Sequence, residues 1–351
     1  MNVIRGGSVA AQTFASQVLA NVAAGDENKG QESIVRAGAI PLLLDLLNKG
    51  KAQTHAARAI ANLARKNEIV QQVIAEEGGI APLIALLNGR SIQSSVKAAE
   101  ALAELARDNH VTQVAIAKAG GIGPLLALLS LRNSEAQSQG MAALAQLARN
   151  NRENQDAIAR LGAVKPLVTL LEAYGSPEVQ AQAASALMEI SWHNPDIQNE
   201  IVTQEGISQL ASLIKSSQSL EVRSEVAGAL WSLAENPVNK ASIAQASTIQ
   251  PLVTLLGDGT ARAAHHAALA IDSLGLSNEE NQAEITQLLI NLLSTGQEEA
   301  QERAIRSLQA LVRQNPHSHD VIAKAAAPEA LVHLLLNAQS ARQSLHDSPF
   351  S

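Results

Sequence analysis

Apolar residues along this chain recur in blocks with helical spacing, and one block returns almost unchanged. The stretch "GAIPLLLDLL" at 38–47 reappears as "GGIAPLIALL" at 78–87, "GGIGPLLALL" at 120–129 and "GAVKPLVTLL" at 162–171. Its prolines, Pro41, Pro82, Pro124 and Pro166, follow one another at a nearly constant interval. A regular period of this length, about 42 residues, predicts stacked helical repeats.

The repeat frame continues beyond residue 171 with weaker matches. Gln209 in "EGISQLASLI" and Pro251 in "STIQPLVTLL" follow in the same frame. The next block, "ITQLLINLL" at 285–293, comes earlier than the period requires and lacks both the Gly and the Pro. This predicts a seventh repeat that has lost most of one helix. The last block is "APEALVHLLL" at 327–336.

Each period divides into three predicted helices. The first is written as in "NPDIQNEIVTQEG", where Asn194, like Asn151 one repeat earlier, is a suitable N-cap. A glycine then marks a sharp bend into the second helix, which carries the Pro in its first turn; these glycines are Gly38, Gly79, Gly121 and Gly162. The third helix is written "HAARAIANLARKN", "VKAAEALAELARDN" and "SQGMAALAQLARNN", with small apolar residues at helical spacing.

Composition supports an extended array. At 351 residues the chain is longer than one compact core usually grows. Although 46% of its residues are apolar, it has only two Trp, two Phe and one Tyr. The core must therefore be built from Ala, Leu, Ile and Val, which suit closely packed helices.

This pattern resembles the armadillo repeat family. The resemblance rests on the period near 42, the phrase "G-x-I-x-P-L-x-x-L-L" and the following "A-A-x-A-L-x-x-L-A-x-x-N", and it covers nearly the whole chain. It implies an all-α fold, a right-handed superhelical solenoid with three helices per repeat, whose third helices line a concave groove. A HEAT array is the lesser alternative, since its units usually have two helices; ankyrin and tetratricopeptide periods do not fit.

We expect one armadillo-repeat solenoid over residues 1–351. It comprises a partial N-terminal repeat at 1–25, eight repeats at 26–337 with the seventh shortened, and a short polar C-terminal helix and tail at 338–351. The opening in mid-repeat suggests a trimmed N-terminus, and the polar closing helix suggests a natural C-terminus.

Several function classes are disfavoured. The chain has no cysteine, no long uninterrupted apolar run, no secretory signal pattern and a net charge of -7 without a basic block. These features predict no nucleic-acid partner, no direct membrane insertion and a cytoplasmic location, with the nucleus as the alternative. No catalytic fingerprint, metal site or cofactor site is recognisable: His265 and His266 are adjacent without a ligand partner, and the loop residues His317 and His319 are expected to be solvated.

The resemblance allows the predicted groove to be compared with importin-alpha. There, an Asn on successive third helices grips the peptide main chain and a Trp four residues earlier stacks on Lys and Arg stems. The Asn register here reads Asn21, Asn62, Glu104, Gln146, Glu189, Ser232, Ser273 and Ala310. The Trp register contains no Trp: it reads Gln17, Arg58, Glu100, Ala142, Ser185, Gly228, Leu269 and Arg306. A nuclear import adaptor is therefore the disfavoured alternative.

Three arginines follow the Asn register by three residues. Arg65, Arg107 and Arg149 are each one period apart and should form a column. In a groove such as that of beta-catenin, such a column could bind an acidic partner. The alternative is structural: an Arg at a helix C-terminus interacts favourably with the helix dipole, and Glu104, Asp108 or Glu68 could neutralise it.

The two tryptophans admit two interpretations. Trp192 continues the register of the arginine column, and Trp231 lies on the next third helix. Either could anchor a partner or fill a gap between helices.

The combined prediction is a non-enzymatic scaffold or adaptor that binds a peptide or a partner surface, without cofactor. The alternatives are a nuclear import adaptor or a targeting module excised from a larger protein such as a ubiquitin ligase. Self-association through the N-terminal repeat face is a further predicted interaction.

Overall fold

The computed structural model describes residues 7–25, 29–49, 52–172, 176–314 and 332. Within these ranges the regular structure is entirely helical, which confirms the predicted all-α class. The chain forms two compact units, Met1–Gln204 and Glu205–Ser351. The superhelical course of the whole array, which depends on how the units sit together, stays a prediction.

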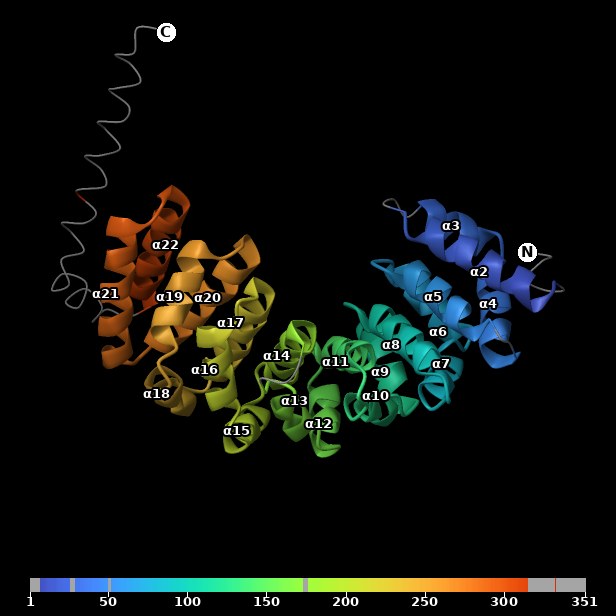
Figure 1. Ribbon diagram of the computed structural model, residues 1–351, viewed down its shortest axis with the longest axis horizontal. Helices are drawn as coiled ribbons and strands as arrows, with labels where there is room; N and C mark the ends of the chain where they lie inside the picture. Colours follow the sequence, from blue (N-terminus) through green and yellow to red (C-terminus); the bar gives the residue numbers. More distant parts are fainter. Residues whose placement is uncertain (1–6, 26–28, 50–51, 173–175, 315–331, 333–351) are drawn as a thin grey trace, which may run out of the picture. The chain divides into compact units, whose positions relative to one another are not determined.

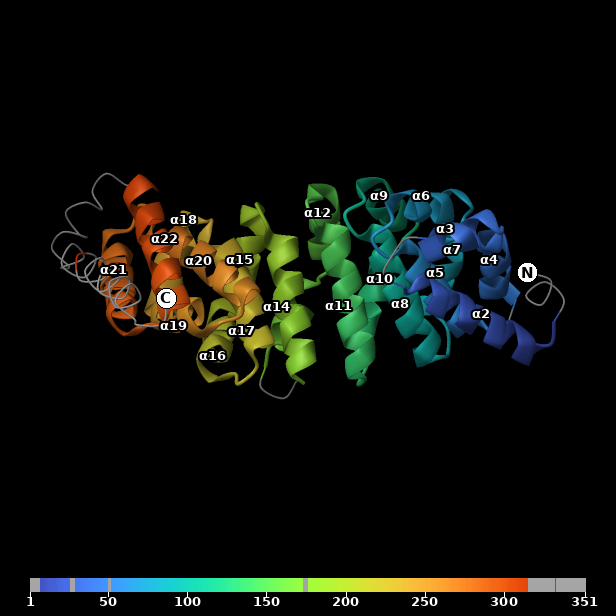
Figure 2. The ribbon, with the colours of Figure 1, turned by 90° about the horizontal axis from the view of Figure 1, so that it is seen from above.

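The first unit contains helices of the three predicted kinds (Figure 1). The third helices are α2 (Val9–Ala23), α5 (Gln53–Ala64), α8 (Ile92–Ala106), α11 (Ser134–Ala148) and α14 (Pro177–Ser191). The first helices are α3 (Lys29–Arg36), α6 (Glu68–Glu76), α9 (His110–Lys118), α12 (Arg152–Arg160) and α15 (Pro195–Thr203). The second helices are α4 (Ala39–Lys49), α7 (Ile80–Leu87), α10 (Ile122–Leu129) and α13 (Val164–Thr169). From α2 to α14, successive third helices of this unit pack on one another, which Figure 2 shows from above.

The second unit starts with the same arrangement and then departs from it. Its helices are α16 (Gly206–Ser216), α17 (Leu220–Ala234), α18 (Pro237–Gln245), α19 (Ile249–Asp258), α20 (Ala261–Gly275), α21 (Glu279–Thr295) and α22 (Glu298–Gln314). The block at 285–293 lies inside α21, one continuous helix in the place of a first and a second helix. The third helix α22 follows it directly and packs on α19, α20 and α21. The last predicted repeat and tail, 327–336 and 338–351, and His317 and His319 lie outside the described residues, apart from residue 332.

The bend between α6 and α7 contains two glycines with different roles. The axes of α6 and α7 meet at 83°. The left-handed backbone at this bend belongs to Gly78, which has a φ of 82° and precedes the predicted bend glycine Gly79. Gly79 is needed for space, because a Cβ there would lie 2.7 Å from Ile74 Cγ2 and 2.9 Å from Ile74 O.

The next repeat has the same division of roles, whereas two other bends have a single glycine. Gly120 has a φ of 79°, whereas a Cβ on Gly121 would meet Ile116 Cγ2 at 2.8 Å. Gly38 and Gly162, which are followed by alanine, themselves have the left-handed backbone, with φ values of 71° and 78°.

The core consists of small side chains where third helices meet and of larger ones between layers. The predicted stripes are fully buried, with 0% exposure at Ala57, Ile60, Ala64, Ala99, Leu102 and Ala106. At the third-helix contacts the same register is an alanine with 0% exposure in four repeats: Ala59, Ala101, Ala143 and Ala186. Such small residues let neighbouring helix backbones approach closely. Leu63, Leu105 and Leu147 fill the layer behind them, where replacing one Leu by Ala typically costs about 2–5 kcal/mol.

None of the described helices is by itself long and apolar enough to cross a bilayer. Two bent pairs, α6 with α7 and α9 with α10, reach that length and composition only when each pair is taken together.

Candidate binding surface on the third helices

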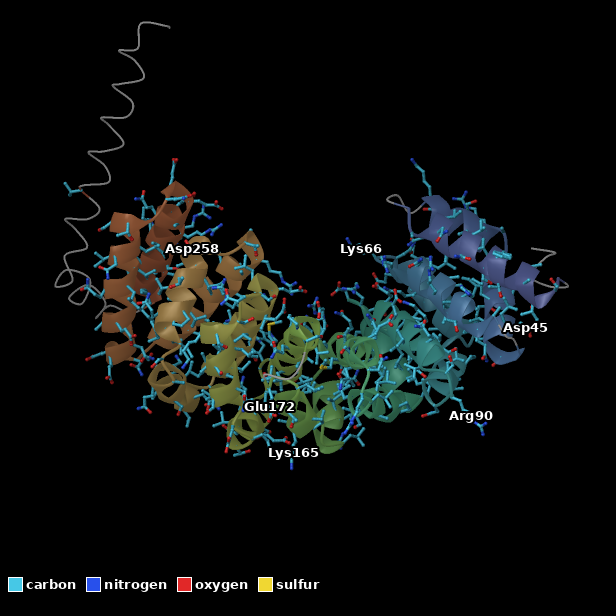
Figure 3. The ribbon with its side chains drawn as sticks, in the orientation of Figure 1. Asp45, Lys66, Arg90, Lys165, Glu172 and Asp258 are labelled. Atoms are coloured by element: carbon cyan, nitrogen blue, oxygen red, sulfur yellow. The ribbon has the colours of Figure 1, made fainter. Side chains whose placement is uncertain are left out.

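Successive third helices of the first unit end in the same way. The C-cap residues are Arg65, Arg107, Arg149 and Trp192. The residue after each has a left-handed backbone, with φ values of 53°, 53°, 51° and 51° at Lys66, Asp108, Asn150 and His193. This conformation is uncommon for residues other than glycine. Its recurrence presents four side chains in equivalent positions, and Lys66 projects from the end of α5 in Figure 3.

A ladder of amide side chains fixes these helix ends to the preceding repeat. Gln71 Nε2 donates to the carbonyl oxygens of Glu104 at 2.9 Å and Arg107 at 3.3 Å, and also to that of Ala64 at 3.2 Å. Asn109 Nδ2 in turn donates to Gln71 Oε1 at 3.0 Å, while Asn109 Oδ1 caps α9 by accepting from the backbone N–H of Thr112. Both side chains are at most 3% exposed, so their polar groups depend on these partners.

The amide ladder repeats along the unit. Gln31, Gln113 and Gln155 donate to the equivalent pairs of carbonyls, at Asn62 and Arg65, Gln146 and Arg149, and Glu189 and Trp192. Asn67, Asn151 and Asn194 donate to the Gln of the preceding repeat and cap their own helices, so the predicted caps at Asn151 and Asn194 are confirmed. Sequence reasoning missed the Gln, although its recurrence once per repeat from Gln31 to Gln155 was the available signal.

The arginine column meets carboxylates inside the protein. Arg107 donates from Nε and Nη2 to both oxygens of Glu104, at 3.0 and 3.2 Å. Arg65 approaches Glu100 and Glu104 at 3.6 Å each, without a side-chain hydrogen bond. Glu104 is 8% exposed, so two cations neutralise one nearly buried carboxylate.

Arg149 connects two neighbouring repeats. Its Nε and Nη2 donate to Glu189 Oε1 at 3.0 and 2.6 Å, and Nη1 lies 3.6 Å from Asp108. Burial acts to lower the pKa of Arg149, but the hydrogen bonds and charges of Glu189 and Asp108 outweigh it and raise the pKa above its usual value. The arginines of the column are therefore partly neutralised within the protein. Two of the carboxylates that the structural interpretation named, Glu104 and Asp108, take part, and Glu189 does so in addition.

The Asn register lies deeper and is used partly for packing. Asn62 is 7% exposed and donates to Ala20 O at 2.8 Å, which joins α5 to α2. Asn21 is exposed and accepts from Arg58 Nη2 at 2.8 Å. Gln146 is half-buried, and its Oε1 has no hydrogen-bond partner. Among the Asn-register residues of the first unit, Gln146 is thus the one with an unpaired buried acceptor.

The tryptophans are half-buried in their respective units. The ring of Trp192 packs on His193 with 4.5 Å between ring centroids. Trp231 lies on α17, three residues after the buried Gly228. Each ring combines packed and accessible surface, so anchoring and packing are compatible at both positions.

Two cavities have several charged groups in their walls. One, of about 610 Å³, lies between α12 and α15 and is lined by Glu153, Asp156, Asp196 and Glu200 with Arg160; burial raises the pKa of Glu200. The other, of about 360 Å³, lies between α20 and α22. No group of three or more metal-ligating side chains occurs among the described residues. His266, 8% exposed, forms a hydrogen bond with Ser224 O at 2.8 Å, whereas its neighbour His265 is exposed.

The sequence and the fold are both similar to those of known proteins. The family described as Armadillo/beta-catenin-like repeat matches residues 151–192, which contain α12, α13 and α14. A crystal structure of an engineered protein is 31% identical with a TM-score of 0.79, covering 95% of this chain and 82% of that chain. The chain belongs to the armadillo repeat family.

Designed members of the family are also similar to this armadillo chain. A designed armadillo repeat protein is 27% identical with a TM-score of 0.58, covering 66% of this chain and 99% of that chain. Another, in complex with the peptide (KR)4, is 26% identical with a TM-score of 0.59 and the same coverage. No curated protein matches the sequence.

Proposed function

We propose that this armadillo chain is a non-catalytic interaction scaffold that binds an extended peptide or partner surface along the third helices of the first unit. The observation that carries the proposal is the recurring helix end. Arg65, Arg107 and Arg149 keep 43%, 35% and 36% of their side-chain surface exposed, at equivalent positions of three successive repeats. The amide ladder holds these positions in place, and a rigid row of equivalent groups suits a ligand with a regular backbone.

The relatives support this assignment. A designed armadillo protein is described in complex with a peptide, and armadillo arrays are non-catalytic scaffolds as a type. The ligand there is basic, whereas the register that would stack on Lys and Arg stems holds no Trp in this chain. A nuclear import adaptor of the importin-alpha type is therefore the weaker proposal, and a targeting module of a larger protein is compatible with the same surface. The proposed location is the cytoplasm, with the nucleus as the alternative.

An acidic ligand would reach the three arginines unequally. Arg107 and Arg149 each use two N–H groups on a carboxylate of the protein, so a ligand has to share or displace Glu104 or Glu189. Arg65 has carboxylates only at 3.6 Å and is the most exposed of the three. A carboxylate or phosphate of the ligand should therefore bind first at Arg65, where it can form charge-assisted hydrogen bonds.

The test is binding of a displayed peptide library to the full chain and to two triple variants. Changing Arg65, Arg107 and Arg149 to Ala should abolish the enrichment of peptides selected by the unchanged chain. The charge-matched control changes Arg36, Arg90 and Arg160, which are exposed and lie off the third helices; Arg90 points into solvent in Figure 3. Circular dichroism verifies that both variants fold. Equal loss in both variants, or no loss in either, would contradict the proposal.

A second interaction, self-association through α2, is favoured by the residues on its exposed face. Phe14, Val18 and Val22 are 66%, 59% and 48% exposed and recur at every fourth position. In the register of Val18 the following repeats have the buried alanines Ala59 and Ala101, and in that of Phe14 they have His55 and Lys97. The bulkier α2 face is thus unlike the internal stacking face. Because α2 has no charged residue, two copies can meet there without repulsion between like charges.

Light scattering across a dilution series tests this association. The unchanged chain should show a concentration-dependent dimer, and Val18→Lys should be monomeric, because the dimer would bury an ammonium against an apolar face. Val238→Lys is the matched control, since Val238 is 79% exposed on the first helix α18. A monomer at all concentrations for the unchanged chain would reject the proposal.

A further inference from the structure

The cavity between α20 and α22 arises from the shortened repeat. Elsewhere a first and a second helix separate successive third helices in sequence, but α21 alone stands between α20 and α22. As a result, α20 packs less extensively on α22 than on α17. The space that remains is about 360 Å³, with Leu256, Ala261, Ala264 and Ala268 forming its apolar wall.

Two residues that line this cavity each carry a buried polar atom without a partner. Asp272 Oδ1, from α20, and Ser307 Oγ, from α22, are buried atoms without a hydrogen bond, and both residues line the cavity. Ser307 is only 2% exposed. Leaving such groups unpaired costs about 1–3 kcal/mol each, and more for a charged group, so the site is poised for a ligand that donates hydrogen bonds.

The other charged groups at the cavity are already neutralised. Arg303 donates to Glu299 at 2.5 Å and to the carbonyl oxygens of Leu256 at 3.1 Å, Gly257 at 3.3 Å and Gly259 at 3.1 Å. Arg306 donates to Glu302 at 2.5 Å. His265 is exposed and completes the set of titratable groups that line the cavity. Asp272 is therefore the lining charge without a counter-charge.

We propose that this cavity binds a primary ammonium group, which donates to the carboxylate of Asp272 and the hydroxyl of Ser307. An ammonium offers three donors on a compact head, a number close to that of the groups available to accept them. A guanidinium offers five, and most of them would be left unpaired here. The apolar wall of Leu256 and the alanines suits the methylene chain behind an ammonium. A lysine side chain of a bound peptide and a free alkylamine share this chemistry.

Burial supports the same site. It raises the pKa of Asp272 to about 7 from its usual 3.8, because no cation stabilises the carboxylate. A bound ammonium would supply that cation and lower the pKa again. Binding should therefore be weak at pH 5, where Asp272 is protonated, and strong at pH 8. The midpoint should follow the raised pKa of Asp272.

The lysine source of the ammonium rests on the proposed peptide-binding function, whereas the site itself does not. The first experiment therefore uses small probes on the full chain: n-butylammonium and Nα-acetyl-lysine methylamide, with Nα-acetyl-norleucine methylamide and Nα-acetyl-arginine methylamide as comparisons. Binding is followed through the side-chain carboxyl signal of ¹³C-labelled Asp272 by NMR. Binding of n-butylammonium alone would assign the site to free amines, and stronger binding of the lysine derivative would assign it to peptides.

The expected result is saturable binding of the ammonium probes with a downward shift of the Asp272 pKa. Asp272→Asn should weaken the binding roughly tenfold or more and Ser307→Ala less, because the bond to a charged group is the stronger one. Asp258→Asn is the matched control, an exposed carboxylate in the same unit that does not line the cavity; it is labelled in Figure 3. If Asp272→Asn fails to fold, the pH dependence of the unchanged chain and of His265→Asn serves instead.

Three outcomes would overturn the inference. These are no shift of the Asp272 signal with either ammonium probe, equal binding of the norleucine derivative, and a pH midpoint that moves with His265→Asn. The first would mean that water alone satisfies the two acceptors. A failed probe experiment together with a successful peptide-library experiment would reject this site and leave the proposed function standing.

Discussion

The two units share a repeat frame but differ in how they satisfy buried polar groups. In the described part of the first unit, the amide ladder, the Arg–Glu pairs and side-chain bonds to nearby carbonyls leave one buried polar side-chain atom without a partner, Gln146 Oε1. The other buried atoms without partners belong to the second unit: Arg223 Nε, Ser224 Oγ, Glu225 Oε2, Asp272 Oδ1, both amide atoms of Gln282, and Ser307 Oγ. Within the described residues, equal helical architecture therefore coexists with unequal polar satisfaction.

The difference can be followed at one register of the first helix. Lys240 replaces the ladder Gln in α18 and donates to Leu276 O at 2.7 Å, and burial lowers its pKa. One repeat further on, the Gln returns as Gln282 in α21, but its amide has no partner. A repeat pattern in the sequence thus preserves the position of a residue without preserving its interaction.

The largest expected effect is on the amide ladder. Gln71→Met keeps the size of the side chain but removes the donor to three carbonyls and leaves Asn109 without its acceptor, so it should lower the free energy of unfolding by roughly 2–4 kcal/mol. The matched change Gln282→Met removes an amide without partners and should be neutral or stabilising. Urea unfolding measures both. A similar loss of unfolding free energy in the two variants would show that the amide hydrogen bonds of the first unit do not stabilise it more than the unpaired amide stabilises the second.

A smaller effect is expected from the arginine column. Arg149→Ala leaves Glu189, 8% exposed, without its cation and should cost on the order of 2 kcal/mol. Arg65→Ala should cost less than about 1 kcal/mol, because Arg107 still pairs with Glu104. Adding Glu189→Gln to Arg149→Ala should restore part of the loss in thermal unfolding. Equal costs for Arg65 and Arg149 would refute this division between binding and structural arginines.

The third effect appears only as a pH dependence, in the second unit. Because folding raises the pKa of Asp272 to about 7, the folded state holds a proton that the unfolded state loses near 3.8. This group therefore makes the protein less stable as the pH rises from about 4 to 7, with no further change above that. Asp272→Asn should remove this trend, so its advantage in unfolding free energy should grow by roughly 2–3 kcal/mol between pH 5 and pH 8, at about 1.4 kcal/mol per pH unit up to pH 7. A constant difference would mean that Asp272 titrates normally.

The predictable part of the molecule is the part that local pattern controls. The period near 42, the third-helix stripes and the caps at Asn151 and Asn194 follow from helical spacing and from side chains that bond to backbone groups nearby in the chain. The bend glycines were predictable only to within one position, because Gly78 and Gly79 both fit the pattern and the backbone decides which one has the positive φ. The equivalent positions of Arg65, Arg107 and Arg149 in successive repeats were also predictable from their spacing.

Contacts between repeats were decided only by the tertiary structure. Arg149 finds Glu189, and Gln71 finds Glu104 and Arg107, in neighbouring repeats far along the chain, so these pairs exist only after the helices have stacked. The cavity beside Asp272 likewise depends on how α22 packs after the single helix α21. The sequence by itself determined the repeats and the family, because helix formation and apolar periodicity are local. Which polar groups are paired and which await a partner was decided by the stacking, because a hydrogen bond or an ion pair depends on sub-ångström placement of groups from different repeats.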